Sequence, residues 1–236
     1  DNGFAFVGYS AGQNVYMVKL NAEYEIEWHK EVYARPGQTD TENIEQDNEG
    51  YFYVGGNCYS DDTNELIWYL IKLDRLGNMV KEKIWRPENS RVSCMKNFVF
   101  VENGLMVLNI VRFEEFPSYF FIYTTFLDKE LEIISEKQRK EVLINNERTI
   151  PEAICSDETG FLLVGFYELG GLWLEKIEND NVVWEKTTGI ADDSSLYYFS
   201  PANCQAVSNG YLIGGYTRNY KPGLVLIDKS GNLIWV

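Results

Sequence analysis

One short phrase occurs five times in this chain, and its spacing is the strongest constraint on the fold. Each copy opens with a glycine and continues as a run of aromatic and β-branched residues: GFAFVGYS at Gly3, GYFYVGGN at Gly50, GLMVLNIV at Gly104, GFLLVGFY at Gly160 and GYLIGGYT at Gly210. Successive copies start 47, 54, 56 and 50 residues apart, which is the length of one four-stranded propeller blade. The sequence therefore predicts an all-β fold, a β-propeller of about five four-stranded antiparallel blades.

Each copy continues with a second apolar strand, a polar turn and a third strand. The second strand reads VYMVKLN from Val15, WYLIKLD from Trp68, FIYTTFL from Phe121, LWLEKIE from Leu172 and LVLIDKS from Leu224. The turns at 74–78 and 228–232 end in Gly-Asn, which suits a tight hairpin with positive φ. The third strand has a tryptophan at one position in three copies, and Lys81 and Ile134 replace it in the others: Trp28, Trp184 and Trp235.

A further strand precedes the glycine in four of the five copies, and we call it the leading strand. The predicted leading strands are Asn43–Gln46, Asn97–Val101, Glu152–Cys155 and Asn203–Val207. The first copy lacks one, so nineteen strands are expected where five complete blades need twenty. Three explanations stay open: one blade has three strands, residues are missing at an end, or the protein has more blades. We expect five blades, and the one segment with helical periodicity, Glu136–Val142, is too short to predict a helix.

Length and charge narrow the class of protein. The 236 residues contain no linker, so we expect one domain over 1–236, with repeats starting near 3, 50, 104, 160 and 210. The apolar runs are shorter than the ~20 residues that cross a bilayer, which predicts no membrane insertion. A formal charge of −15 argues against nucleic acid as a partner, because phosphates require clustered Lys and Arg. We expect a monomer with a solubilising acidic surface.

Four cysteines are too few for a disulfide framework in a chain of this length. We expect a buried thiol at each of Cys58, Cys94, Cys155 and Cys204. The alternative is a bridge between Cys155 and Cys204, which lie on the leading strands of adjacent blades.

Signatures of catalysis and metal binding are weak. The only histidine, His29, falls on an outer strand, so neither a zinc site nor a Ser-His-Asp arrangement is expected. No catalytic residue, metal or cofactor is therefore predicted. Carboxylate pairs occur only in expected loops, where solvated surface charge is the favoured interpretation over a glycosidase pair: Asp61-Asp62, Glu114-Glu115 and Asp192-Asp193. A calcium site at 61–65 is a minority interpretation, because that loop lacks the spacing of an EF-hand.

The long and variable connections of the predicted blades all emerge on one face, where binding residues concentrate on rigid scaffolds. Tyrosine and arginine, which commonly anchor binding surfaces, recur at its rim. The predicted ligand-binding residues are Tyr9, Arg35, Tyr59, Arg91, Arg148, Tyr167, Tyr216 and Arg218. The alternative interpretation is that the tyrosines only flank strand ends, with their hydroxyl groups in water.

The phrase ENIEQDNEGYFYVGGNCYS, followed by WYLIKLDRLGN, is similar to bacterial β-propeller repeats of the SBBP type. The closing GGYT and LVLIDKSGNLIW resemble blades of quinoprotein-like propellers, although no quinone or calcium residues carry over. The resemblance covers the whole chain as a repeat pattern. It implies an extracytoplasmic bacterial protein (periplasmic, cell-surface or secreted) with a binding or scaffolding role.

The resulting functional hypothesis is a non-catalytic propeller that recognises a protein, peptide or glycan on its long-loop face. The alternative is a carbohydrate-active hydrolase or lyase that uses loop carboxylates, which would require two of them to converge in one pocket. The second alternative is a structural module of a longer chain.

Overall fold

The computed structural model describes residues 3–9, 14–33, 39–60, 65–88, 90–113, 115–116, 119–143, 149–167, 171–188, 199–217 and 221–235. They fall into two compact units, which we describe separately. The first unit comprises Asp1–Pro117 and Thr124–Lys137, and the second comprises Ser118–Tyr123 and Gln138–Val236.

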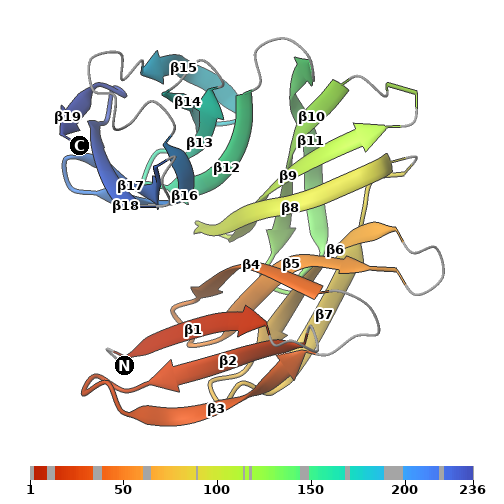
Figure 1. Ribbon diagram of the computed structural model, residues 1–236. Helices are drawn as coiled ribbons and strands as arrows, with labels where there is room; N and C mark the ends of the chain where they lie inside the picture. The colour runs from red at the N-terminus through yellow and green to blue at the C-terminus, as the bar shows by residue number, and fades with distance from the viewer. Residues whose placement is uncertain are drawn as a thin grey trace. The chain divides into compact units, whose positions relative to one another are not determined.

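The described residues form nineteen strands in five antiparallel sheets (Figure 1). In each sheet, strands that are neighbours in sequence also pair in space, as expected for propeller blades. The first blade contains β1 (Phe4–Tyr9), β2 (Val15–Leu20) and β3 (Ile26–Tyr33). The second contains β4 (Thr39–Gln46), β5 (Phe52–Tyr59), β6 (Leu66–Leu73) and β7 (Met79–Trp85).

The remaining three blades have four strands each. The third contains β8 (Ser90–Val101), β9 (Gly104–Phe113), β10 (Tyr119–Asp128) and β11 (Ile133–Leu143). The fourth contains β12 (Thr149–Ser156), β13 (Phe161–Tyr167), β14 (Leu172–Glu178) and β15 (Asn181–Thr188). The fifth contains β16 (Ser200–Val207), β17 (Gly210–Tyr216), β18 (Pro222–Asp228) and β19 (Leu233–Trp235).

The predicted fold class, a five-bladed β-propeller, is therefore confirmed. Over the described residues the first blade has three strands. This agrees with the sequence, in which the first repeat shows no leading strand. The segment 136–142, whose helical periodicity was weak, belongs to β11. The single-domain expectation stays a prediction.

All four leading strands contain a β-bulge at one repeated position. The register shifts across Glu42, Lys96, Glu152 and Ala202, so that each of these residues is extra to the pairing. A bulge interrupts the alternation of side chains between the two faces of a strand. This explains why the strands begin at Thr39, Ser90, Thr149 and Ser200, well before the starts that the sequence pattern indicates.

Opposite the bulge, three blades require a glycine. A Cβ at Gly56, Gly165 or Gly215 would overlap a backbone carbonyl of the leading strand. Gly8 occupies the equivalent position in the first blade, five residues after the glycine that opens its phrase, and a Cβ there would have nothing within 4 Å. The first blade thus retains the glycine that accommodates a bulged leading strand, although none pairs with β1 among the described residues.

The second blade has one extra residue in the turn that joins its leading strand, β4, to β5. Gly3, Gly104, Gly160 and Gly210 each lie against a carbonyl of the neighbouring strand, which leaves no room for a side chain. In the second blade, Tyr51 takes the place of that glycine, because the Asp47 amide donates to the Tyr51 carbonyl at 3.0 Å. Gly50 lies one residue earlier, in the turn, with φ of +88°, a conformation that glycine adopts without strain.

The turns between the third and fourth strands of the blades also serve as contact points between blades. The carboxylate of Asp228 accepts hydrogen bonds from the Ser230 and Asn232 amides at 2.8 Å, and Gly231 has φ of +78°. The Trp184 ring of the fourth blade lies against Gly231, and the Lys186 ammonium donates to the Asn232 side chain at 2.7 Å. The same arrangement joins the first two blades.

Between the first and second blades, the Trp28 ring lies against Gly77, and the Lys30 ammonium donates to the Asn78 side chain at 2.9 Å. The repeated tryptophan therefore packs on the turn of the next blade, which explains why it recurs on an outer strand. Trp235 occupies the same position of the fifth blade and is 44% exposed.

Each unit has an apolar core between its blades. In the first unit, Val15 and Met17 of β2 pack with Val54, Tyr69 and Ile71 of the second blade. In the second unit, side chains of the fourth and fifth blades form a corresponding cluster: Leu162, Val164, Leu174, Tyr211, Ile213 and Val225. All of them are almost completely buried.

The second core contains a disulfide bond between Cys155 of β12 and Cys204 of β16, whose Cα atoms are 5.5 Å apart. The expectation of a buried thiol is thus wrong for these two residues. It fails because the leading strands of the two blades bring the two cysteines within bonding distance, a proximity between strands that residue spacing does not reveal. Cys58 is buried in β5, as expected, and Cys94 is half-buried in β8.

Candidate functional site

Four of the predicted binding residues lie at strand ends. Tyr9, Tyr59, Tyr167 and Tyr216 are the last residues of β1, β5, β13 and β17, the strands that open each repeated phrase. Tyr9 is 61% exposed and Tyr216 is 52% exposed, whereas Tyr59 is half-buried. The Tyr167 side chain lies outside the described residues. The repeat therefore places a tyrosine at the same end of four blades.

The predicted arginines are not described by the structure. Arg35, Arg148 and Arg218 lie outside the described residues, and Arg91 is described only as backbone within β8. The carboxylate pairs 61–62 and 192–193 and residue 114 are also outside them. The binding face predicted from the long loops stays a prediction.

A surface hollow of about 700 Å³ lies on the fifth blade. Its residues come from all four strands: Ala202, Asn203, Gly214, Gly215, Tyr216, Pro222, Gly223, Leu224 and Trp235. Three glycines form part of its lining, and the Tyr216, Leu224 and Trp235 side chains are each 44–52% exposed. Apolar hollows with a few polar groups are the usual form of ligand sites.

Sequence reasoning identified one residue of this hollow, Tyr216. The others were visible only as parts of the repeat: Asn203 as the start of a leading strand, Gly214 and Gly215 as a strand end, and Trp235 as the blade tryptophan. The signal that could have found them is the comparison of equivalent positions between blades.

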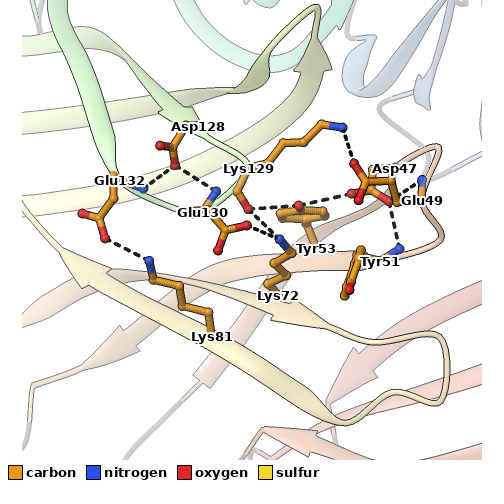
Figure 2. A network of polar contacts seen from close by, with 10 residues as sticks. All are labelled: Asp47, Glu49, Tyr51, Tyr53, Lys72, Lys81, Asp128, Lys129, Glu130 and Glu132. Atoms are coloured by element: carbon orange, nitrogen blue, oxygen red, sulfur yellow. Dashed lines mark hydrogen bonds and ion pairs between the residues drawn. The ribbon is translucent and has the colours of Figure 1, made fainter.

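A polar network of the first unit surrounds a buried lysine (Figure 2). Lys72 is 6% exposed, and its ammonium donates to the Glu130 carboxylate at 2.7 Å and to the Lys129 carbonyl at 3.0 Å. The same ammonium lies 4.7 Å from the centre of the Tyr51 ring. The Tyr53 hydroxyl donates to the Lys129 carbonyl at 3.1 Å, so Lys72 and Tyr53 hold the turn of the third blade together.

The second unit has a counterpart around Lys176, which is 2% exposed. Its ammonium donates to Asp157 Oδ1 at 2.7 Å, and the Tyr211 hydroxyl of the fifth blade donates to Asp157 Oδ2 at 2.5 Å. Burial works to raise the pKa of Asp157, but hydrogen bonds from Lys176, Tyr211 and Thr159 hold that pKa well below its usual range. Burial raises the pKa of the Tyr211 hydroxyl, and the neighbouring Asp157 carboxylate raises it further.

These networks are arranged for stability and not for proton transfer. A general acid or base needs a pKa near the working pH. Here Asp157 stays ionised and Tyr211 stays protonated across the neutral range. The pKa of Tyr53 is also raised, first by burial and then by the negative charge of Asp47. Lys19 (3% exposed) occupies the equivalent position in the first blade and pairs with Glu27 at 3.1 Å. A buried lysine is thus a structural element of three blades.

No group of three or more His, Cys, Asp or Glu side chains within the described ranges could hold a metal ion. His29 is exposed on β3, an outer strand of the first blade, as predicted. The residues that the structure describes hold no helix with the length and apolar character that crossing a membrane requires.

Comparison with known proteins supports the fold and leaves the family open. No protein-family model matches the chain, and no curated protein matches it. Among solved structures, the chain is similar to an acylaminoacyl peptidase from Pyrococcus horikoshii, with 14% identity and a TM-score of 0.52. That match covers all of this chain and 36% of the peptidase chain, so this chain spans about a third of that protein. At this identity, the likeness shows the fold alone.

Two further matches have lower TM-scores. Apo AztD from Citrobacter koseri is 8% identical, with a TM-score of 0.43, over 95% of this chain and 67% of its own. The Cps50 (Swd1) β-propeller domain of Myceliophteria thermophila is 7% identical, with a TM-score of 0.35, over 93% of this chain and 98% of its own.

Proposed function

We propose that this protein is a non-catalytic recognition module that binds its ligand in the hollow of the fifth blade. The observation that carries the proposal is the exposure of Tyr216, Leu224 and Trp235 in a hollow whose lining includes three glycines. Large apolar side chains that gather at an exposed concave surface indicate a binding site. Tyrosine and tryptophan contribute large contact areas with little loss of side-chain entropy, which is why they are common anchors.

A propeller suits this role because its blades are rigid and the surface is formed before the ligand arrives. The Cys155–Cys204 disulfide and the Lys176–Asp157–Tyr211 network both join the fourth and fifth blades and hold the fifth in place. A preformed surface spends less of its binding free energy on ordering side chains.

The proposal is tested by screening the purified protein against a glycan array and a displayed peptide library, and by titrating the hits. We expect at least one ligand whose affinity falls tenfold or more in the Tyr216→Ala and Trp235→Ala variants. Tyr24→Ala, which removes an exposed tyrosine from the first blade, is the matched control and should leave the affinity unchanged. Ligands that bind all three variants equally would place recognition elsewhere on the molecule.

We also propose that the protein works outside the cytoplasm, as a monomer. The disulfide supports this location, because such bonds persist in oxidising compartments and are rare in the reducing cytosol. The resemblance of the repeats to bacterial SBBP-type blades supports it too. Thiol-specific labelling followed by mass spectrometry of protein taken directly from its native host should find Cys155 and Cys204 protected. Full labelling of both would contradict the proposal.

A further inference from the structure

The second and fifth blades carry the same three residues at equivalent positions. In the second blade, Asn43 of β4 pairs with Gly55 of β5, which pairs with Leu70 of β6. In the fifth blade, Asn203 of β16, Gly214 of β17 and Leu224 of β18 are paired in the same order. Both asparagines directly follow the extra residue of the bulge.

In the second blade, these residues bind an extended segment of the same unit. That segment is part of β8, the leading strand of the third blade. The Asn43 side-chain amide donates to the Phe98 carbonyl at 2.8 Å and to the Asn97 side chain at 2.7 Å. The glycine receives the side chains of the segment, because a Cβ at Gly55 would lie 3.0 Å from the Phe98 ring and 3.1 Å from the Met95 sulfur.

Within the described part of the second unit, no segment covers the same residues of the fifth blade. A Cβ at Gly214 would have one neighbour within 4 Å, the Leu224 side chain at 3.7 Å. Leu224 is 51% exposed, whereas Leu70 is completely buried. Asn203 is exposed, and its side chain has no hydrogen-bond partner among the residues that the structure describes. All three residues line the hollow described above.

We propose that the hollow of the fifth blade binds an extended peptide segment that carries an aromatic residue, as the second blade binds Met95–Phe98. This inference rests on the proposed function and names the ligand class of the same site. The Asn203 amide donates to the backbone carbonyl of the aromatic residue. The aromatic ring lies on Gly214, and Tyr216 and Trp235 flank the segment.

The composition of the chain refines the choice of peptide. The protein has a formal charge of −15, which attracts a neutral or basic segment more strongly than an acidic one. The segment bound by the second blade has a lysine, Lys96, between Met95 and Asn97. The pattern we expect is therefore apolar, basic or polar, asparagine, aromatic, in an extended conformation.

The protein itself supplies the probe. A fluorescently labelled peptide with the sequence of residues 95–101 (MKNFVFV), flanked by lysines for solubility, is titrated with the intact protein while fluorescence anisotropy is recorded. Wild-type protein should bind it saturably. Asn203→Ala removes one hydrogen bond and should weaken binding about tenfold. Gly214→Val fills the place of the ring and should abolish binding, as should alanine in place of the phenylalanine that corresponds to Phe98.

Two controls keep these results interpretable. Thermal unfolding of each variant establishes that it is folded, and Asn203→Ala changes only an exposed side chain. Phe6→Ala alters the exposed face of the first blade, where an extended peptide could otherwise bind, and should leave the affinity unchanged. Binding that Phe6→Ala removes and Asn203→Ala preserves would overturn the inference.

The inference and the proposed function can fail separately. If the selected ligands are glycans or non-aromatic peptides whose binding depends on Trp235, the inference is wrong and the proposed function stands. If no ligand depends on Tyr216 or Trp235, both are wrong. Absence of saturable binding of the probe peptide to folded wild-type protein also overturns the inference.

Discussion

The second and fifth blades have the same residues at the same register positions, yet among the described residues of its own unit one surface is covered and the other is not. Asn43, Gly55 and Leu70 lie beneath the leading strand of the third blade, whereas Asn203, Gly214 and Leu224 line a hollow. The comparison teaches that a repeat can use one arrangement of side chains for two purposes. Where a neighbouring segment fills it, the arrangement stabilises the fold, and where it stays open, it can bind a ligand.

The largest expected difference between the two blades is at the paired leucines. Leu70→Ala should lower the free energy of unfolding by about 3 kcal/mol, because it removes buried methyl groups and leaves a cavity. Leu224→Ala should change it by less than about 0.5 kcal/mol, because half of that side chain is already in water. Urea denaturation of both variants measures the difference. Equal losses would show that the fifth blade is covered in solution.

The disulfide is a second point of difference, because the second blade has Ile44 where the fifth has Cys204. Replacing both cysteines of the bridge by alanine should lower the free energy of unfolding by about 2–4 kcal/mol. Replacing Cys58 by alanine is the control for loss of a buried thiol. If dithiothreitol lowers the melting temperature of the wild type and not that of the double variant, the bridge is responsible for the difference.

The paired asparagines should differ by less. Asn43→Ala should lower the free energy of unfolding by about 1–2 kcal/mol, because the Phe98 carbonyl and Asn97 side chain both lose a donor. Asn203→Ala should leave stability unchanged and weaken ligand binding instead. Chemical denaturation measures the first effect and anisotropy the second. A stability loss of the same size in both variants would remove the basis of the comparison.

The smallest effect concerns pH. Burial raises the pKa of Glu45 to about 7, whereas the fifth blade has Gln205 at the same position. The native state therefore retains this proton between the unfolded pKa of about 4.5 and pH 7, so ionisation of Glu45 lowers stability as the pH rises through that interval. Glu45→Gln should stabilise the protein by about 1 kcal/mol at pH 8 after allowance for partial exposure, and have little effect at pH 4.5.

The check is a pair of denaturation curves at these two pH values. Gln205→Glu is the converse variant, and its exposed side chain should show no such pH dependence. If the effect of Glu45→Gln is the same at both pH values, Glu45 does not titrate as proposed.

Much of the fold could be predicted from the sequence because blade repeats are local patterns. The identity of the described strands, and the lack of a leading strand beside β1 among them, follow from spacing and from the glycine phrase. The starts of the leading strands could not be predicted, because the bulges at Glu42, Lys96, Glu152 and Ala202 break the alternation. The extra residue in the turn before β5 could not be predicted either. A glycine fits both the turn position that Gly50 occupies and the strand position that Tyr51 takes, so the pattern does not distinguish them.

The candidate site was less predictable because it depends on contacts between distant residues. Tyr216 was identified from its position at a strand end. Asn203 and Gly214 occupy the same positions of the repeat as Asn43 and Gly55, so the repeat pattern does not tell which pair is covered. Only the packing of Met95 and Phe98 on one of them, and the exposure of Leu224 beside the other, separates the two.

The most direct test is nuclear magnetic resonance of the labelled protein during titration with the Met95–Val101 peptide. If the fifth blade binds as the second does, the Asn203 side-chain amide and the backbone amides of Gly214 and Gly215 should shift saturably. The Asn43 side-chain amide and the Gly55 amide should stay unchanged, because β8 already covers them. Shifts confined to Phe6 and Gly8, or none at Asn203 with folded protein, would contradict the account.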